Sequence, residues 1–397
     1  MEFRLSATEE AFRADVRGWL DATLPAVRAA AAQRPAGSAA DTIDAAKAWQ
    51  RTLFDGGWAG ITWPRDYGGR GATLVEQLLF NEACAAAGAP DSINLAVALG
   101  LVGPTLMVCG TPAQRTRFLP RILRGDDIWC QGFSEPNAGS DLAGLKTRGD
   151  VHGDHISVTG QKIWTSFAQY ADWCILVVRT DPRAAKHRGL SFLLVDMKSP
   201  GITIRPLVEM TGEAWFNEVF FDEVKVPRDL VVGEVDKGWD VVITTLAHER
   251  GGAAPHARLR RELHGLIDLA RRPRPSAGEP AARDPRIRQQ LAQLAVEVQI
   301  AKLTAYRNVS GILRTGKPGP EGSILKLFWS EVEQRLIEVA CAILGPYATL
   351  WRDEPRAIDG GSWARELLWT RAATIYAGTS EVQRNIIAQR VLGLPRN

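Results

Sequence analysis

The stretch "CQGFSEPNAGSDLAGLKTRG", from Cys130 to Gly149, gathers hydroxyl groups and glycines within a few residues. Ser134, Gly139 and Ser140 offer hydroxyls and unencumbered backbone amides, which can bind the polar edge of a cofactor or its phosphates. Loops rich in Ser, Gly and Pro are also common connectors. Taken alone, the stretch leaves a cofactor loop and an ordinary loop both open.

A second stretch, "VTGQKIWTS", places Trp164 and Ser166 two residues apart. On a β-strand such residues point to the same face. An aromatic plane would then stand beside a hydroxyl, which suits a flat heteroaromatic ligand. A core Trp next to an incidental Ser is the alternative, because buried Trp commonly anchors a core.

A third stretch pairs His248 with Glu249 and Arg250 after the apolar run "WDVVITTLA". The zinc motif H-E-x-x-H is excluded because Gly251 and Gly252 follow Arg250. The chain also lacks a G-x-G-x-x-G after a strand and a G-x-x-x-x-G-K-[ST] loop, so neither a Rossmann site nor a P-loop is supported.

The length and composition limit how many structural units can position these groups. A chain of 397 residues with 45% hydrophobic residues can bury a large core, and single cores rarely grow beyond about 250–300 residues, so we expect two or three structural units. The net charge is only +3, and no basic stripe is interleaved with aromatic residues. We therefore expect no nucleic-acid partner.

The cysteines and the N-terminus indicate the compartment. Five scattered cysteines without a CxxC pair suggest neither a disulfide framework nor a zinc or other metal site. The first twenty residues lack the apolar core of a signal peptide and predict an amphipathic helix with a capping box of Ser6 and Glu9. No apolar run reaches the length of a membrane span. We expect a cytoplasmic protein.

The residue pattern changes twice along the chain, from helical to strand-like and back to helical. Residues 1–125 alternate Ala- and Leu-rich segments with Gly/Pro breaks, which predicts an N-terminal α-helical domain. Residues 126–235 carry β-branched and aromatic runs such as "WCILVVRT", which predict a middle antiparallel β domain. Residues 236–397 return to helical spacing and predict a C-terminal helical bundle. One apolar face of this bundle is formed by Ile287, Leu291, Leu294, Val298 and Ala301.

Together these stretches resemble the acyl-CoA dehydrogenase family over essentially the whole chain. "GFSEPNAGSD", "GQKIWTS", "FNEVFFDEVKVP", "HERG" and "IYAGTSEVQRNIIAQRVLGLPR" occur in the family's order. The resemblance implies an α+β fold with an N-terminal all-α domain, a middle antiparallel β-barrel domain and a C-terminal four-helix bundle.

The resemblance also implies a noncovalent FAD held against the β domain. Donors along the flavin's polar edge stabilise the negative charge that develops as it accepts hydride. The implied cofactor-binding residues are Gln131, Phe133, Ser134, Gly139, Ser140, Trp164, Ser166, Thr379 and Glu381.

The base is the main departure from the commonest family pattern. Many members carry a Glu just before the Gly-Thr of "IYxGT", whereas this chain has Ala377 there, which cannot titrate. A smaller group, similar to isovaleryl-CoA and long-chain acyl-CoA dehydrogenases, carries its Glu on a bundle helix directly before an Arg. By this resemblance Glu249 is the base. The alternative is a solvated helix-face Glu, as most are.

Ala377 retains a backbone N–H, which the family uses to hydrogen-bond the thioester carbonyl. Substrate contacts are implied for Ser140, Arg250 and Gly378. We also expect Ser380 and Gln383 to form a capping box at the start of the last helix.

The implied activity is dehydrogenation of an acyl-CoA thioester to the trans-2-enoyl-CoA, with electrons passed to an electron-transferring flavoprotein. A flavin-dependent oxidase or monooxygenase, or a catalytically silent FAD-binding partner subunit, are the alternatives. The family's Arg-x-x-Phe-Gly motif is missing, so a homotetramer (dimer of dimers), a dimer and a heteromer with a related subunit all stay open. The acyl group is open too, with a branched or polycyclic group as one choice.

Overall fold

The computed structural model describes residues 4–33, 39–90, 95–251, 255–273, 278–352 and 354–395, and the side chains of all of these except 39, 40 and 249–251. The chain forms two compact units. Met1–Gln77 and Ala89–Gly252 make the first, and Leu78–Gly88 and Ala253–Asn397 make the second. The predicted boundaries at 125/126 and 235/236 remain predictions.

The helices of the first unit follow the predicted patterns. At the start of α1, the hydroxyl of Ser6 accepts the N–H of Glu9 and the Glu9 carboxylate accepts the N–H of Ser6, so the predicted capping box is confirmed. Phe12 and Val16, four residues apart on one face of α1, are buried. The helices are α1 (Ala7–Ala32), α2 (Ala39–Asp55), α3 (Leu74–Ala87, whose last ten residues belong to the second unit), α4 (Gly103–Cys109), α5 (Pro112–Arg124) and α6 (Gly238–Gly251).

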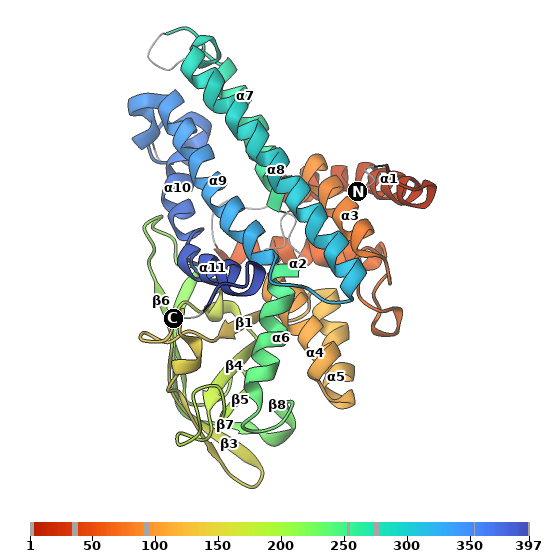
Figure 1. The fold of residues 1–397 in the computed structure, drawn as a ribbon, viewed down its shortest axis with the longest axis vertical. Coiled ribbons are helices and arrows are strands. Elements are labelled where there is room, and N and C mark those ends of the chain that lie inside the picture. The colour runs from red at the N-terminus through yellow and green to blue at the C-terminus, as the bar shows by residue number, and fades with distance from the viewer. Residues whose placement is uncertain are drawn as a thin grey trace. The chain divides into compact units, whose positions relative to one another are not determined.

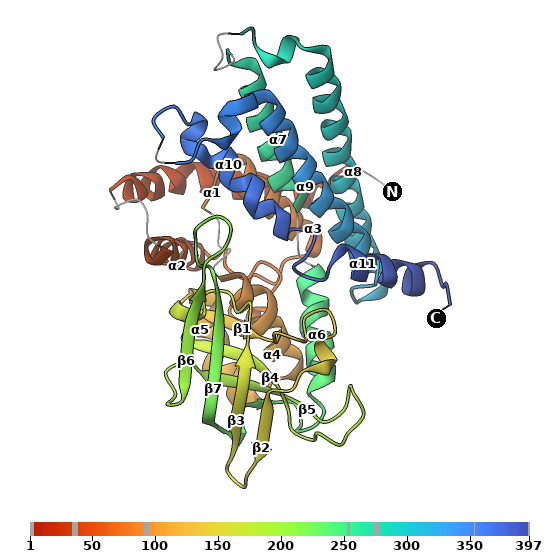
Figure 2. The same ribbon diagram turned by 90° about the vertical axis from the view of Figure 1, so that its left-hand side faces the viewer.

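The first unit also contains an eight-stranded sheet, seen side-on in Figure 1 and from its face in Figure 2. Its path runs β6-β7-β3-β2-β4-β5-β8, with β1 paired to β4. The pairings along this path are antiparallel except β2 with β4, and β1 with β4 is also parallel. The sheet is therefore mixed and not purely antiparallel as predicted. The strands are β1 (Trp129–Gly132), β2 (Arg148–Val151), β3 (His155–Lys162), β4 (Trp173–Arg179), β5 (Leu190–Asp196), β6 (Ile202–Leu207), β7 (Phe216–Pro227) and β8 (Val231–Val232).

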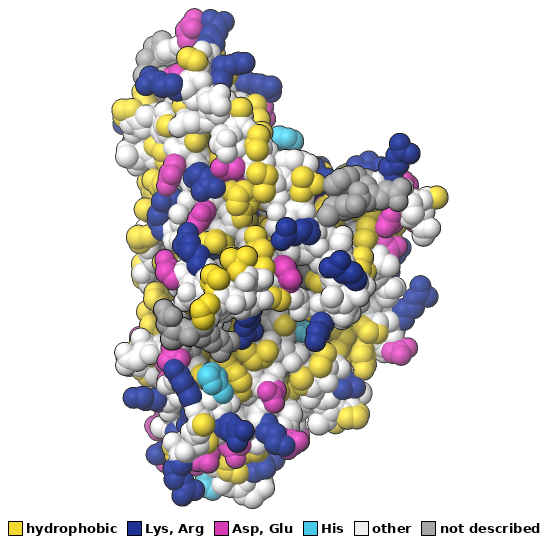
Figure 3. All heavy atoms as spheres, in the orientation of Figure 1, with side chains coloured by type: hydrophobic (Ala, Val, Ile, Leu, Met, Phe, Trp, Pro, Cys, Tyr) yellow, Lys and Arg dark blue, Asp and Glu magenta, His cyan; other side chains and the backbone are white. Residues whose placement is uncertain are grey.

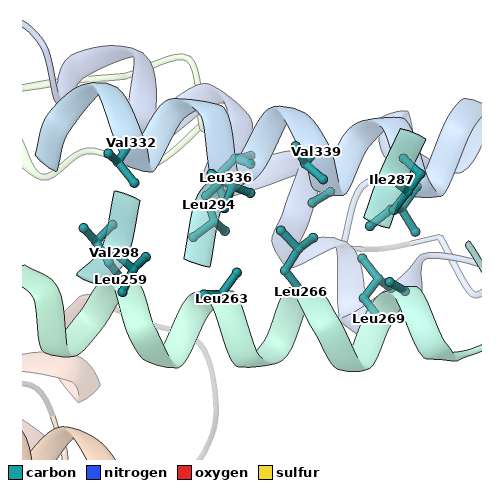
Figure 4. Packing of buried hydrophobic residues seen from close by; sticks show 14 of the residues in the cluster. Leu259, Leu263, Leu266, Leu269, Ile287, Leu294, Val298, Val332, Leu336 and Val339 are labelled. Carbon is teal, nitrogen blue, oxygen red and sulfur yellow. The ribbon is translucent and has the colours of Figure 1, made fainter. Parts of the chain in front are cut away.

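The second unit is built on three long helices that run side by side in both ribbon views (Figures 1 and 2). Leucines of α7 meet α8 and α9 side chains in one apolar core, as Figure 4 shows for Leu263, Leu294 and Leu336. The predicted α8 face is buried at four of its five positions, with Leu291 half-buried. The helices are α7 (Pro255–Arg271), α8 (Pro285–Thr315), α9 (Gly322–Leu344), α10 (Ser362–Trp369) and α11 (Ser380–Ile386).

The surface in view in Figure 3 carries basic and acidic side chains interspersed with apolar ones, so neither sign of charge dominates that face. Among the described residues, no helix has the length and apolar character needed to cross a membrane. The described residues also contain no group of three or more His, Cys, Asp or Glu arranged to bind a metal.

One polar cluster is partly buried inside the second unit, with Glu333 fully buried and Arg258 and Glu262 half-buried. Arg258 on α7 pairs with Glu333 on α9 at 2.5 Å and lies 3.7 Å from Glu262. Burial, together with the charges of Glu333 and Glu366, raises the pKa of Glu262 to about 7, although Arg258 opposes the shift. One oxygen each of Glu262 and Glu333 has no hydrogen-bond partner in the described chain. Two carboxylates therefore share one guanidinium in a poorly solvated site.

Glu262 makes stability pH-dependent. Its folded pKa of about 7 lies above its ordinary value of 4.5, so the folded state binds more protons between these values and loses stability as pH rises through them. We expect the unfolding free energy of Glu262→Gln, relative to the parent, to rise by about 1–3 kcal/mol from pH 5 to pH 8. Thermal or urea unfolding at both pH values measures it. The exposed Glu279→Gln is the control, and parallel pH curves for Glu262→Gln and the parent would contradict the prediction.

Candidate functional site

A buried ion pair joins the two stretches that the sequence singled out in the β-sheet unit. Lys162, the last residue of β3, is 0% exposed, and its Nζ donates to the Phe133 carbonyl (3.0 Å) and the Glu135 carboxylate (2.9 Å). The N–H of Ile163 donates to the Ser134 carbonyl at 2.9 Å. The loop after β1 is thereby held against the end of β3, and Ser134 lies beside the segment that carries Trp164.

The Glu135 carboxyl is held in its ionised form. Burial pushes the pKa of Glu135 up, but the charge of Lys162 and hydrogen bonds from Thr147 and the Lys146 amide outweigh it, so the pKa is lowered. Burial lowers the pKa of Lys162, and the Glu135 carboxylate opposes that shift. Backbone N–H groups of Lys146 and Thr147 complete the carboxylate's shell at 2.7 and 2.8 Å. The buried charges are thus compensated by partners.

The prediction that Trp164 and Ser166 share one face of a strand is wrong, because β3 ends at Lys162. Lys162 pairs with Val219, and the ladder contact resumes where the Thr165 N–H donates to the Asn217 carbonyl at 3.1 Å. Two residues on this side therefore face one on β7, as in a β-bulge, and Trp164 takes a positive φ of 58°. The extra residue turns the indole outward, where 58% of Trp164 is exposed.

The polar groups of this region fit the edge of a flavin. Within the described residues, the half-buried hydroxyls of Ser134 and Ser166 make no hydrogen bond, and the buried hydroxyl of Thr165 has no partner. Gly139 and Ser140 are exposed, and a Cβ at Gly139 would meet no atom within 4 Å. Free donors next to an exposed aromatic plane are what a planar, hydrogen-bonding cofactor requires.

Two of the predicted cofactor residues contribute differently from the rest. Phe133 is buried with its ring packed edge-on against Phe192 at 5.9 Å, so its side chain belongs to the core and only its backbone faces the loop. Gln131 is half-buried within β1.

In the second unit, the stretch around Ala377 forms a tight left-handed turn. Ala377 has φ 53° and Gly378 has φ 86°. Thr379 caps α11 by accepting the Val382 N–H at 3.2 Å. The predicted capping box of Ser380 and Gln383 is therefore wrong. Gln383 turns back instead, because the carbonyls of the left-handed turn face it.

The Ala377 amide has no acceptor among the described residues, and Ala377 is only half-buried. An unpaired N–H held by the backbone is a donor available to a ligand. A cavity of about 420 Å³ lies next to this turn, with Thr379 and Glu381 in its wall. Its wall is largely charged, with Glu331, Arg335 and Arg384 among its residues, and Ala377 is not part of it.

Glu249 and Arg250 lie in the last turn of α6, and their side chains fall outside the described residues. Their predicted roles remain predictions. The neighbouring His248 is half-buried, and burial lowers its pKa.

Sequence reasoning missed Lys162 and Glu135, and it gave Gln383 a capping role instead of its contact with the turn. The sequence did contain a signal for Lys162. It lies an even number of residues from the buried Ile156 and Val158, so on a strand its side chain points to the same face as theirs. A lysine on the inward face of a strand must find a buried partner. No comparable pattern marks Gln383, whose role depends on the turn before it.

The chain belongs to the acyl-CoA dehydrogenase family, since sequence profiles of that family's N-terminal, middle and C-terminal domains match residues 6–126, 130–224 and 236–392. The predicted fold class is confirmed: a helical N-terminal part, a middle β-sheet part and a helical C-terminal part. The protein is an FAD-dependent oxidoreductase that dehydrogenates an acyl-CoA, as the resemblance implied.

Several individual proteins and solved structures are similar to this chain over its whole length. The acyl-CoA dehydrogenase IpdE1 of Mycobacterium tuberculosis is 41% identical over 390 residues, which cover 98% of both chains. The crystal structure of the ChsE4-ChsE5 complex from Mycobacterium tuberculosis superposes with a TM-score of 0.85 at 32% identity, covering 100% of both chains. A structure named Tcur3481-Tcur3483 steroid ACAD superposes with a TM-score of 0.85 at 31% identity, again over 100% of both chains.

The buried pair allows a double-variant test. Lys162→Met leaves the Glu135 carboxylate buried without its cation, which should cost about 3–5 kcal/mol of unfolding free energy. Glu135→Gln in the same chain removes the stranded charge and should recover part of that loss. Urea unfolding of both single variants and of the double variant measures the coupling. Additive losses would show that the two side chains do not stabilise each other.

Proposed function

We propose that Glu249 removes the α-proton of the acyl-CoA thioester while a hydride leaves the β-carbon, giving the trans-2-enoyl-CoA. Bound FAD supplies the acceptor for that hydride. The observation that carries the proposal is the turn at 377, which offers no titratable side chain but keeps an N–H without an acceptor among the described residues. Glu249 stands at the position that a subgroup of the family uses instead, at the end of a helix whose preceding residues are largely apolar.

The amide of Ala377 activates the thioester carbonyl in this proposal. Removing the α-proton moves negative charge onto that carbonyl oxygen, and a fixed N–H stabilises it without reorganisation. The positive φ of Ala377 supports this role, because a left-handed non-glycine residue costs energy that the surrounding contacts must offset. Arg250, Gly378 and Ser140 are the further proposed substrate contacts.

FAD is bound by groups from both stretches of the β-sheet unit. Ser134 and Ser166 present hydroxyls to the flavin, with the Trp164 ring beside it and the exposed Gly139 and Ser140 toward the phosphates. The support is that the two serine hydroxyls make no hydrogen bond in the described part of the chain and that the indole is exposed. Gln131, the backbone of Phe133, Thr379 and Glu381 complete the proposed set.

We propose a polycyclic acyl group as the substrate. One similar structure is named a steroid ACAD. In this chain η3 (Val97–Val102) is a π-helical turn, a geometry frequent at functional sites, and it packs against α6, which carries Glu249. Gly100 in that turn is exposed, and a Cβ there would meet nothing within 4 Å. This glycine leaves room for a wide group beside η3.

The electron acceptor we propose is an electron-transferring flavoprotein, in a cytoplasmic setting. A heteromer with a related subunit is favoured over a homotetramer. The similar ChsE4-ChsE5 and Tcur3481-Tcur3483 structures each name two chains. This chain also lacks the Arg-x-x-Phe-Gly motif by which family members contact a neighbour's FAD.

Anaerobic mixing tests the base. The flavin of the purified protein should bleach when the right acyl-CoA is added, and Glu249→Gln should slow bleaching about 10²–10⁴-fold while retaining FAD, because a general base contributes that much. Glu234→Gln, an exposed residue before α6 paired with Lys237, is the matched control. Bleaching of Glu249→Gln at the parent's rate would refute the base assignment.

A bulky substitution in η3 tests whether the acyl group of the substrate is wide. Gly100→Phe should lower kcat/KM for a steroid-derived acyl-CoA about 10–100-fold, since a pocket discriminates by the groups it cannot admit, and should leave butyryl-CoA turnover nearly unchanged. Gly265→Phe, on α7 where a Cβ also meets nothing within 4 Å, controls for surface bulk. Equal losses on both substrates would contradict a wide acyl pocket at η3.

A further inference from the structure

Gln383 faces the left-handed turn that presents the Ala377 amide. It is 0% exposed, and its Nε2 donates to two backbone carbonyls, that of Ala377 at 2.9 Å and that of Gly378 at 3.2 Å. One side chain thus binds both carbonyls of the turn. We propose that Gln383 is a positioning residue that locks this turn so that the Ala377 N–H stays free for the thioester carbonyl. The inference rests on the carbonyl-donor role of Ala377 given above.

The turn needs an external lock because its conformation is unfavourable by itself. A non-glycine residue in the left-handed region costs about 1–2 kcal/mol. Two successive positive φ values, at Ala377 and Gly378, aim both carbonyls at the same buried amide. If Ala377 relaxed to an ordinary φ, its peptide planes would rotate and its N–H would point elsewhere. The hydrogen bonds to Gln383 oppose that rotation.

Separate contacts fix the chain on both sides of the turn. Before it, the buried Lys326 donates to the Ala373 carbonyl at 3.0 Å. Across it, the Ser380 N–H donates to the Thr374 carbonyl at 2.9 Å. These anchors do not involve Gln383. Its removal should therefore loosen the turn without releasing the segment.

The orientation of the Gln383 amide is set by its partners. The opposite orientation would press Oε1 against two carbonyl oxygens, so Nε2 must face the turn. As a result Oε1 is buried without a partner in the described chain, which costs free energy that an apolar side chain of the same length would avoid. The donor is therefore the property that distinguishes Gln383 from a packing residue. Gly378 supports the same geometry, since a Cβ there would lie 2.5 Å from Nε2.

The first test replaces the donor by a similar shape. In anaerobic bleaching with the fastest acyl-CoA, Gln383→Met should lower the maximal rate about 10–100-fold with little change in the half-saturating concentration, because the lost interaction acts on the developing charge. The matched control is Gln114→Met. Gln114 is also buried and also donates one Nε2 to two carbonyls, of Asp229 and Val231, at 2.8 Å each. The control should lose stability but not maximal rate.

The second test restores the donor by pH. A glutamate at 383 can donate only when protonated, and burial beside two carbonyls raises its pKa. The bleaching rate of Gln383→Glu, divided by the parent's at each pH, should therefore recover as pH falls, whereas the same ratio for Gln383→Met should not change with pH. A purely structural role would give ratios independent of pH for both.

The outcomes separate the inference from the function beneath it. If the parent bleaches and Gln383→Met bleaches equally fast, the positioning role is wrong and the proposed function stands. If Gln383→Met does not fold, the pH dependence of Gln383→Glu decides, and a flat ratio refutes the role. If no acyl-CoA bleaches the parent, the proposed function and the inference fail together.

Discussion

The β-sheet unit depends on a lysine and a glutamate that are both removed from water. Lys162 ends β3 at a position where a side chain must point inward, and its ammonium lies against Glu135 and the Phe133 carbonyl. Two charges in such a place are tolerated only when every remaining hydrogen-bonding group is also satisfied. Here the backbone of Lys146 and Thr147 satisfies the carboxylate. The pair therefore joins the end of β1, the start of β2 and the end of β3 at one point.

The proposed flavin edge follows from that junction. Once the loop bearing Ser134 is held to Ile163, the next residue along, Trp164, is the extra one in the bulge and leaves the sheet. The hydroxyls of Ser134 and Ser166 make no hydrogen bond within the described residues. In the second unit, Gln383 binds the carbonyls of the left-handed turn at Ala377, whose N–H has no acceptor among the described residues.

The outline of the fold could be predicted because it depends on local patterns. The capping box at Ser6 and the α8 face from Ile287 to Ala301 are visible as spacing, and the structure confirms them. Spacing failed at Trp164, where an alternating pattern predicted a strand that the bulge interrupts. It failed again at Ser380 and Gln383, since a capping pattern and a turn-binding glutamine have the same sequence. Lys162 and Glu135 were missed because they lie 27 residues apart in the chain. Gln383 binds carbonyls only five and six residues before it, but those carbonyls face it only because the turn is left-handed.

By itself the sequence determined the class of protein, the order of helical and β parts, and the absence of a carboxylate at 377, because residue types and motif order are local facts. Only the tertiary structure decided that Lys162 is a buried charge, that Trp164 is exposed, and that the Ala377 amide has no acceptor in the described chain. Burial and hydrogen-bond satisfaction are properties of neighbours brought together by folding. The spacing of residues along the chain does not determine which carbonyl accepts a hydrogen bond from a given N–H.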